Sequence, residues 1–328
     1  MNKTYILIIK KDDFDFKEIL GIPLLYYHFL RARSQNSSLF LVTDDQKYID
    51  FFNNCKLEKE ISDNCYITLS NCFEKDVKFN LTKKEALKII ESKEIKEKDF
   101  IIRTNKDFYS FRNIVKEYIN FKFIENGVDI ENISTTYIGP EVNIEKGTKI
   151  TGDTHIYGKS CIGKNNLISS SYIENTNIKD DNKILNSHIV GAMIGCKNEI
   201  GPFCRMRGKA VIDNECVLGN FVEIKSSNIK DHVKIKHLSY IGDTFIEKNV
   251  NIGCGFVTAN YDGKRKYPTT IEENVFVGCN TTIVSPVTLK ENCFIAAGSV
   301  ITKDVEKNDL AIARSRQINK TNYVKQKK

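Results

Sequence analysis

An aliphatic residue returns every six positions over long stretches of the second half of this chain, and this repeat limits the possible folds more than any other feature. This six-residue interval is uninterrupted through Ile138, Ile144, Ile150, Ile156, Ile162 and Ile168, and again through Ile271, Val277, Ile283, Leu289, Ile295 and Ile301. A period of six fits neither an α-helix nor a single strand. It is typical of flat-sided coils that each bury one aliphatic residue per side against the next coil. We therefore predict a left-handed parallel β-helix of hexapeptide repeats.

The repeat covers only part of the 328 residues, and a chain of this length suffices for two domains. The N-terminal part instead alternates strand-like and helix-like apolar patterns, at 5–10 and 39–43 for strands and at 20–33 and 114–123 for helices. This alternation predicts a small α/β domain. The predicted organisation is an α/β domain at 1–125, a linker at 126–137, the β-helix at 138–305 and a polar C-terminal arm at 306–328.

The six-residue rhythm is interrupted in one place, between Thr258 and Thr270, where residues 260–266 (NYDGKRK) replace hexads. A loop inserted into a solenoid leaves one face of it and commonly carries function, although such an insertion can also be merely tolerated. We expect a protruding loop here.

Composition excludes several classes of function. The net charge of +7 comes from lysines spread along the chain, without an arginine-rich helix or a nucleic-acid motif. The ten cysteines lie singly and form no CxxC or Cys/His cluster, so we expect buried free thiols and neither disulfides nor a metal site. The apolar runs are too short for a membrane span or a signal peptide. We therefore expect a cytoplasmic protein that binds neither nucleic acid nor membrane.

Two cations and a histidine stand out within the repeat. At eighteen residues per coil, Arg207 and Lys225 should lie on adjacent coils, one above the other. Aligned cations without an evident acidic partner favour an anion between them, such as a phosphate. Pairing with Glu223 or solvent is the alternative. His237, two hexads beyond Lys225, is a candidate general base, although a lone histidine is more often structural.

The residues around these three resemble the acetyltransferase half of the GlmU family, the bifunctional N-acetylglucosamine-1-phosphate uridylyltransferases and glucosamine-1-phosphate N-acetyltransferases. The resemblance is carried by residues 200–207 (IGPFCRMR), 219–225 (GNFVEIK), 237–243 (HLSYIGD), 251–255 (NIGCG) and 260–263 (NYDG), and continues through 276–278 (FVG), 295–298 (IAAG) and 311–314 (AIAR). It is strong over about 200–318 and weaker back to residue 126. This ordered set is far more specific than hexads alone.

The resemblance implies a role for each matching residue. His237 would be the general base that deprotonates the sugar amine. The substrate would be held by Arg207, Lys225 and Lys266 at the phosphate and by Tyr240 and Asn251 at the sugar, with Glu223 in support of the site, orienting the base. Acetyl-CoA, the co-substrate, would be held by Asn260, Tyr261, Cys279, Ala297 and Arg314. Cys279 replaces the serine expected in the family, and a thiol is a weaker hydrogen-bonding group. The transfer needs no metal, and the family assembles as homotrimers with shared sites.

The N-terminal domain departs from the family pattern, because the family's nucleotidyltransferase domain is about twice as long. After the strand at Tyr5–Ile9, residues 10–15 (KKDDFD) lack the glycine that would let the backbone approach a phosphate. We therefore predict a reduced, degenerate nucleotidyltransferase-like domain without uridylyltransferase activity. Two alternatives to the acetyltransferase remain: an acyltransferase acting on another amino sugar, and a non-catalytic hexapeptide-repeat scaffold.

Overall fold

A computed structural model describes residues 105–324 and, before them, five short strands. The chain divides into two units, Met1–Val115 and Lys116–Lys328. In the first unit a three-stranded parallel sheet has the order β1–β4–β5, and β2 pairs with β3 in antiparallel fashion. These strands are β1 (Thr4–Ile8), β2 (Glu18–Ile19), β3 (Ile22–Pro23), β4 (Ser38–Thr43) and β5 (Cys65–Leu69).

The strands predicted at 5–10 and 39–43 correspond to β1 and β4, and the helix predicted at 114–123 lies within the longer α4 (Asn105–Glu125). Within the helix predicted at 20–33, Ile22–Pro23 instead form β3, and the rest of that segment lies outside the described residues. The degenerate nucleotide site was inferred from residues 10–15, which also lie outside them. None of the described helices is long and apolar enough to cross a membrane.

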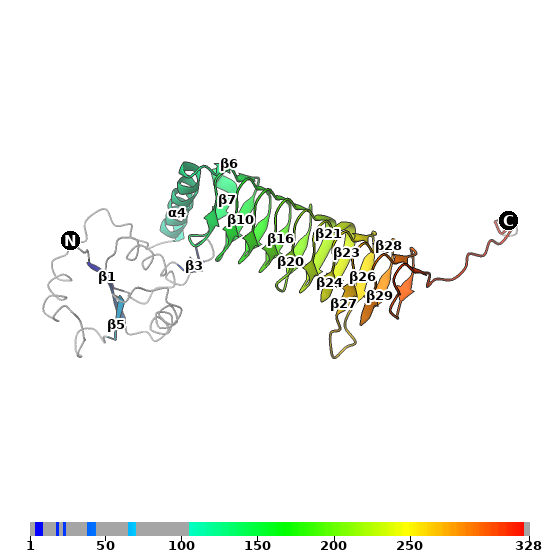
Figure 1. Cartoon of the computed structure of the whole chain (residues 1–328). Helices are drawn as coiled ribbons and strands as arrows, with labels where there is room; N and C mark the ends of the chain where they lie inside the picture. The colour runs from blue at the N-terminus through cyan, green and yellow to red at the C-terminus, as the bar shows by residue number, and fades with distance from the viewer. Residues whose placement is uncertain are drawn as a thin grey trace. The chain divides into compact units, whose positions relative to one another are not determined.

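The second unit is a parallel β-helix of hexapeptide repeats, so the predicted fold class is confirmed here (Figure 1). Nine of its strands form one sheet: β8 (Asn143–Ile144), β11 (Cys161–Ile162), β14 (Asn177–Ile178), β17 (Met193–Ile194), β20 (Val211–Ile212), β22 (Asn228–Ile229), β24 (Thr244–Ile246), β27 (Thr269–Ile271) and β30 (Val287–Leu289).

The remaining nineteen strands form a second, continuous sheet. They are β6 (Asp129–Ile130), β7 (Thr136–Ile138), β9 (Lys149–Thr151), β10 (Thr154–Tyr157), β12 (Leu167–Ser169), β13 (Tyr172–Glu174), β15 (Lys183–Leu185), β16 (His188–Val190), β18 (Glu199–Ile200), β19 (Arg205–Arg207), β21 (Val217–Lys225), β23 (Lys234–Gly242), β25 (Asn251–Ile252), β26 (Phe256–Ala259), β28 (Phe276–Val277), β29 (Thr282–Val284), β31 (Phe294–Ile295), β32 (Val300–Ile301) and β33 (Leu310–Ala311).

The aliphatic residues of the repeat form the core of the β-helix. Ile138, Ile150, Ile156 and Ile168 have no exposed surface, and Ile162 has 2%. Stacked coils bury these side chains against one another, and burial of apolar surface is the main stabilising contribution to such a fold. The coil length varies: Leu167 pairs with Lys183 sixteen residues later, whereas Arg207 pairs with Lys225 eighteen residues later. A coil of about eighteen residues therefore holds at Arg207 and Lys225, but not along the whole β-helix.

The β-helix begins earlier than the sequence pattern indicates. The segment 126–137, predicted as a linker, contains β6, the 3-10 turn η1 (Ile133–Thr135) and the first residues of β7, and β6 already pairs with β9. Helix α4 packs against this first coil, where Lys116 Nζ donates to the carbonyl of Ser134 and the buried Asn120 Nδ2 donates to the carbonyl of Thr136. These bonds satisfy backbone groups that a terminal coil leaves unpaired, which is the role of a solenoid cap.

Candidate functional site

The two stacked cations come from the ends of neighbouring strands. Arg207 ends β19 and Lys225 ends β21, and the two residues are register partners, as their spacing predicts. The next residue in this column is Gly242, at the end of β23. Two successive coils thus place a cationic side chain at one corner of the β-helix, and a glycine follows on the third.

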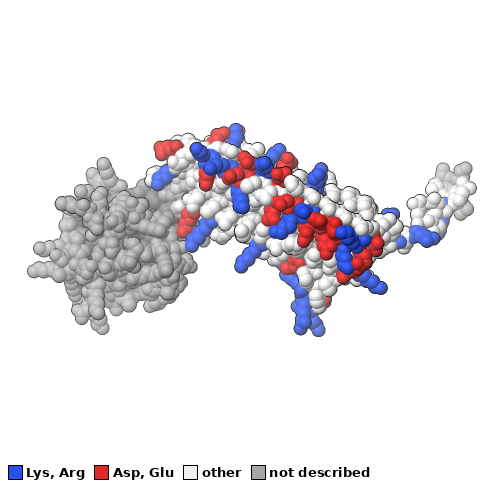
Figure 2. Space-filling model, in the orientation of Figure 1, with Lys and Arg blue, Asp and Glu red and all other residues white. Residues whose placement is uncertain are grey.

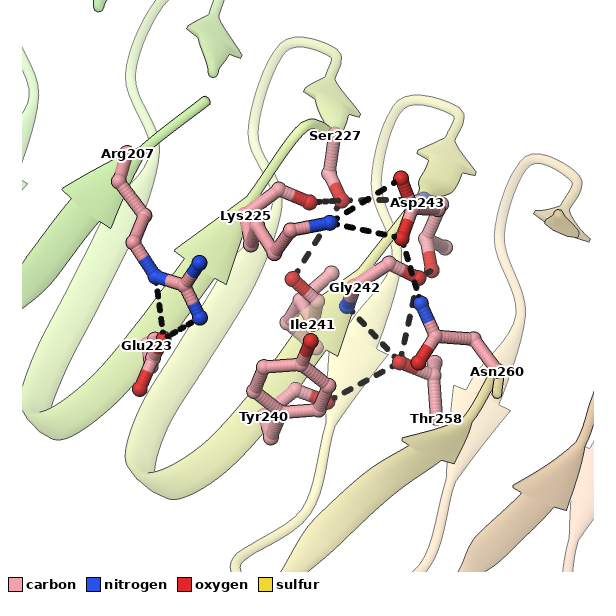
Figure 3. Close-up of polar contacts among 11 residues, drawn as sticks. Arg207, Glu223, Lys225, Ser227, Tyr240, Ile241, Gly242, Asp243, Thr258 and Asn260 are labelled. Carbon is pink, nitrogen blue, oxygen red and sulfur yellow. Dashed lines mark hydrogen bonds and ion pairs between the residues drawn. The ribbon is translucent and has the colours of Figure 1, made fainter. Parts of the chain in front are cut away.

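Both cations have acidic partners, so the prediction that they lack one is wrong. Arg207 donates to Glu223 Oε1 from Nε at 2.8 Å and from Nη2 at 2.7 Å, and Lys225 Nζ lies 3.1 Å from Asp243 Oδ2 (Figure 3). The alternative, pairing of Arg207 with Glu223, is confirmed, and unpaired charge does not indicate an anion here. The side chain of Lys225 is only 13% exposed, compared with 40% for Arg207.

A buried asparagine holds the carboxylate of Asp243. Asn260 is 5% exposed, and its Nδ2 donates to Asp243 Oδ2 at 2.6 Å. Asn260 also accepts a hydrogen bond from the backbone N of Tyr267 at its carbonyl oxygen, which closes the base of the inserted loop. Within one chain Asn260 therefore lies at the cation corner.

The inserted loop between β26 and β27 protrudes from the solenoid, as predicted, and presents exposed Lys264, Arg265 and Lys266 (Figures 1 and 2). Its turn is fixed by Asp262, whose Oδ1 accepts from the backbone N of Lys264 and of Arg265. Those two backbone bonds, that of Arg265 first, lower the pKa of Asp262.

Lys266 returns from this loop to the side chain of Lys225. The nearby Lys266 raises the pKa of Lys225, with Asp243 acting in the same direction, and the nearby Lys225 lowers the pKa of Lys266. Repulsion from Lys225 and Arg207 also lowers the pKa of Lys266. We call Arg207, Lys225 and Lys266 the cation cluster. Its three cations face two carboxylates, so one net positive charge remains when all five groups are ionised.

His237 lies at a different corner from the cation cluster. It is exposed and sits five residues before the end of β23, which corresponds to about 16 Å of extended strand. Within the described residues no hydrogen bond or ion pair joins His237 to the cluster. The expectation that successive coils of one chain gather this histidine and the cations around one pocket therefore stays a prediction.

The contact of His237 also differs from expectation. Its Nδ1 lies 3.2 Å from Asn220 Oδ1, one coil below, whereas Glu223 contacts Arg207. Because an amide oxygen only accepts, this contact places the proton on Nδ1 and leaves Nε2 as the acceptor. Glu223 thus orients a cation, and Asn220 orients the histidine.

Further residues stack on His237 in later coils. The register on both sides of this corner aligns His237 with Cys254, then Cys279, then Ala297. Arg314 Nη1 donates to the carbonyl of Ala297 at 2.8 Å. We call this column, from Asn220 to Ala297, the His237 corner. It brings together three of the five residues expected to bind acetyl-CoA, namely Cys279, Ala297 and Arg314.

The remaining predicted site residues divide between the two corners. Tyr240 points toward the cation cluster, because its hydroxyl lies against Gly242, the register partner of Lys225. A Cβ on Gly242 would be only 2.6 Å from this hydroxyl. Exposed Tyr261 is on the inserted loop and bridges to Lys266. Asn251 pairs with Lys234, ahead of the His237 corner.

The seven described cysteines are free, as predicted, but only three of them are buried. Burial raises the pKa of Cys204 and of Cys216 to about 12 and that of Cys293 to about 11. Cys161 and Cys279 are exposed, which the prediction of buried thiols did not anticipate.

Three neighbours of the site were not identified from the sequence: Asn220, Asp243 and Cys254. Asp243 follows Lys225 by eighteen residues, the same interval that aligned Lys225 with Arg207. Applying that interval once more would have found it. Asn220 and Cys254 are each seventeen residues from His237, and a fixed coil length hides them.

Comparison with known proteins agrees with this division of the chain. Residues 268–303 match the family described as Bacterial transferase hexapeptide (six repeats). The chain is 42% identical over 212 residues to the bifunctional protein GlmU of Staphylococcus haemolyticus and 45% identical over 212 residues to that of Geobacillus sp., in each case 64% of this chain. The matches cover 47% and 46% of those proteins, so the chain spans about half the length of the curated relatives it matches.

A solved UDP-N-acetylglucosamine acyltransferase from Bacteroides fragilis is 18% identical, with a TM-score of 0.39 over 53% of this chain and 70% of that chain. This likeness adds nothing on function. The relatives match the C-terminal two-thirds of the chain, which contains both corners. Over its hexapeptide-repeat β-helix, the chain is similar to the bifunctional GlmU proteins.

Proposed function

We propose that this chain is a glucosamine-1-phosphate N-acetyltransferase that uses acetyl-CoA as donor. The observation that carries the proposal is the cation cluster. Three cations, from two successive coils and an inserted loop, lie together and leave a net positive charge. They belong to the part of the chain that is similar to GlmU. Such a cluster suits a dianionic phosphate monoester, because charge-assisted hydrogen bonds to phosphate are strong.

Each group at the cluster has a role in holding the sugar phosphate. Arg207, kept in place by Glu223, and the two lysines would bind the phosphate oxygens. Tyr240 points into the same region and would contact the sugar, together with Asn251. A free amino sugar without the phosphate would lose all three charged contacts.

His237 would act as the general base. Its Nδ1 is engaged by Asn220, so Nε2 is the nitrogen that can accept a proton. The amine nitrogen of the sugar attacks the thioester carbonyl carbon of acetyl-CoA while His237 takes the amine proton. The tetrahedral intermediate then collapses, the C–S bond breaks, and the proton passes to the departing thiolate. The products are N-acetylglucosamine-1-phosphate and coenzyme A, and no metal is needed.

Acetyl-CoA would run along the His237 corner. Cys279 and Ala297 stack above the histidine at successive coils, and Arg314 at the end of the column would meet the nucleotide phosphates. Asn260 and Tyr261 lie at the cation corner of their own chain, so they would reach the acetyl group and pantetheine arm from a neighbouring copy.

A homotrimer would complete the site, with His237 of one copy facing the cation cluster of another. An exposed apolar ridge beside the histidine supports this assembly. Phe203 and Phe221, 57% and 56% exposed, stack with ring centroids 5.4 Å apart, and Leu238 next to His237 is 59% exposed. Both phenylalanines have left-handed backbone angles, φ 61° and 59°, which bulky residues rarely adopt. An apolar ridge of this kind is typical of an interface.

We further propose that the N-terminal domain carries out no uridylyl transfer, so that the product leaves for a separate nucleotidyltransferase on the way to UDP-N-acetylglucosamine and cell-envelope precursors. Incubation with uridine triphosphate, magnesium and N-acetylglucosamine-1-phosphate should release no pyrophosphate above background. Release above background would overturn this part of the proposal.

The acetyl transfer is tested by thiol release from acetyl-CoA in the presence of glucosamine-1-phosphate. His237→Ala should lower turnover by about 10²- to 10⁴-fold, the usual contribution of a general base. The matched control is His232→Ala, because His232 is also exposed but is paired with Glu215 at another corner. If His237→Ala leaves the rate unchanged, His237 is not the general base. If transfer to glucosamine is as efficient as transfer to glucosamine-1-phosphate, the cation cluster does not bind the substrate phosphate.

A further inference from the structure

Lys225 is the most buried member of the cation cluster, and its position depends on Asp243. Its ammonium lies 3.1 Å from Asp243 Oδ2 and 3.4 Å from Oδ1, so it contacts both carboxylate oxygens. The Lys225 side chain is 13% exposed and the Asp243 side chain 26%. A lysine side chain otherwise has many rotamers, and this contact selects one of them.

Asp243 is itself fixed from the opposite side. Asn260 donates to it at 2.6 Å from a buried position, and the backbone N of Asp243 donates to the carbonyl of Lys225 at 2.9 Å. Because the backbone carbonyl of Asn260 also accepts the bond from the backbone N of Tyr267, Asn260 joins the coil of Asp243 to the loop of Lys266. The Lys225–Asp243 ion pair is thus linked, through Asn260, to the base of the loop that carries Lys266.

We propose that Asp243, held by Asn260, is a positioning residue for the sugar-phosphate site, which fixes the Lys225 ammonium at the base of the loop that carries Lys266. The inference rests on the proposed function. Asp243 acts through the lysines and not on the reacting atoms. Its carboxylate lets two adjacent amines hold the charge that a phosphate dianion requires.

The electrostatics of the cluster support this role. Lys225 and Arg207 lower the pKa of Lys266, whereas Asp243 raises it. Asp243 also raises the pKa of Lys225, after the contribution of Lys266. The other titratable group facing Lys225 is Tyr240. Removing the carboxylate therefore lowers both lysine pKa values, so the cluster loses charge at a lower pH and binds phosphate more weakly from that pH upward.

The variant Asp243→Asn distinguishes a positioning role from a purely structural one. The amide keeps the size of the carboxylate, and its oxygen still accepts the hydrogen bond from Asn260, but the negative charge is lost. The full chain should show a KM for glucosamine-1-phosphate raised about tenfold or more, as for loss of a charge-assisted hydrogen bond. The KM for acetyl-CoA and the Tm should stay unchanged. The alkaline limb of kcat/KM for the sugar phosphate should move to lower pH.

The matched control is Asp213→Asn, which removes the same kind of ion pair, Asp213 with Lys230 at 2.9 Å, away from the cluster. It should leave every parameter unchanged. The inference is overturned if Asp243→Asn behaves as Asp213→Asn does, or if it lowers the Tm and raises both KM values together.

Direct binding of glucosamine-1-phosphate, measured by titration calorimetry without acetyl-CoA, keeps the inference separate from the proposed function. Wild-type binding that Asp243→Asn weakens supports the inference even if no coenzyme A is released, in which case the proposed function fails alone. Turnover by wild type with equal affinity in Asp243→Asn overturns the inference alone. Absence of wild-type binding overturns both.

Discussion

At the scale of single residues, exposure decides which side chains of this β-helix can meet a ligand. Cys204 and Cys216 point into the core, where burial raises the pKa of each thiol to about 12. Cys279 occupies an exposed position at the His237 corner, and Cys161 is exposed in β11, in the other sheet. The same residue type therefore serves as core filling in one place and as surface in another.

This difference predicts a pattern of chemical labelling. Iodoacetamide at pH 8 should modify Cys161 and Cys279 in the folded chain and reach Cys204 and Cys216 only after unfolding, since a buried thiol with a pKa of about 12 gives almost no thiolate. Acetyl-CoA should slow the labelling of Cys279 and leave Cys161, its matched control, unaffected. Peptide mass spectrometry measures both rates. Equal labelling of Cys279 with and without acetyl-CoA would contradict the assignment of the His237 corner.

At the scale of elements, the inserted loop owes its shape to one carboxylate. Asp262 accepts two backbone hydrogen bonds and a third from the Tyr267 hydroxyl at 3.0 Å. Because these contacts lower its pKa, they stabilise the turn fully above the unfolded pKa, near 3.8, and are lost as the pH falls through the lower, folded value. Throughout the neutral range the turn thus presents Lys266 to Lys225.

Asp262→Ala should therefore loosen the loop without disturbing the coils. We expect the KM for glucosamine-1-phosphate to rise several-fold, on the order of one lost charge-assisted hydrogen bond in the loop. The Tm should not change, because the loop lies outside the packed core. Tryptic cleavage after Lys264 and Arg265 should become faster. A KM equal to that of wild type, despite faster cleavage, would show that the loop's shape does not matter for substrate binding.

At the scale of the whole molecule, each chain offers two half-sites. One strand, β23, carries His237 near its middle and ends beside Lys225. In the proposed homotrimer, the histidine of one copy would face the cations of another. Symmetric oligomers allow this arrangement, because each copy contributes a different corner to the same interface.

This arrangement predicts complementation between inactive chains. His237→Ala and Lys225→Ala should each have strongly reduced activity alone. Co-expressed with different affinity tags and purified through both, the mixed assembly should recover part of the thiol release, since some interfaces combine an intact histidine from one copy with an intact lysine from the other. Co-expression of two differently tagged His237→Ala chains is the control. Mixed assemblies as inactive as this control would contradict a shared site.

The sequence alone was enough to predict the β-helix, because its repeat is local: one aliphatic residue every six positions can be buried only by coiling. The alignment of Arg207 with Lys225 followed from the same repeat. The Asp243 partner of Lys225 lies one eighteen-residue interval further on and was open to the same reasoning. The alignment of His237 with Asn220 and Cys254 was missed because coil lengths of sixteen to eighteen residues, and one of twenty-five at Asn251 and Phe276, shift neighbours by amounts that the repeat does not reveal.

The sequence by itself therefore determined the coiled core, the protruding loop and the residue types available for chemistry. Only the tertiary structure decided which of these residues meet. Whether two side chains come into contact depends on the summed register of many coils and on the corner that each side chain occupies. Both are set by the stacking of all the coils together. That is why His237 and the cations, close in sequence, lie at different corners of the same chain.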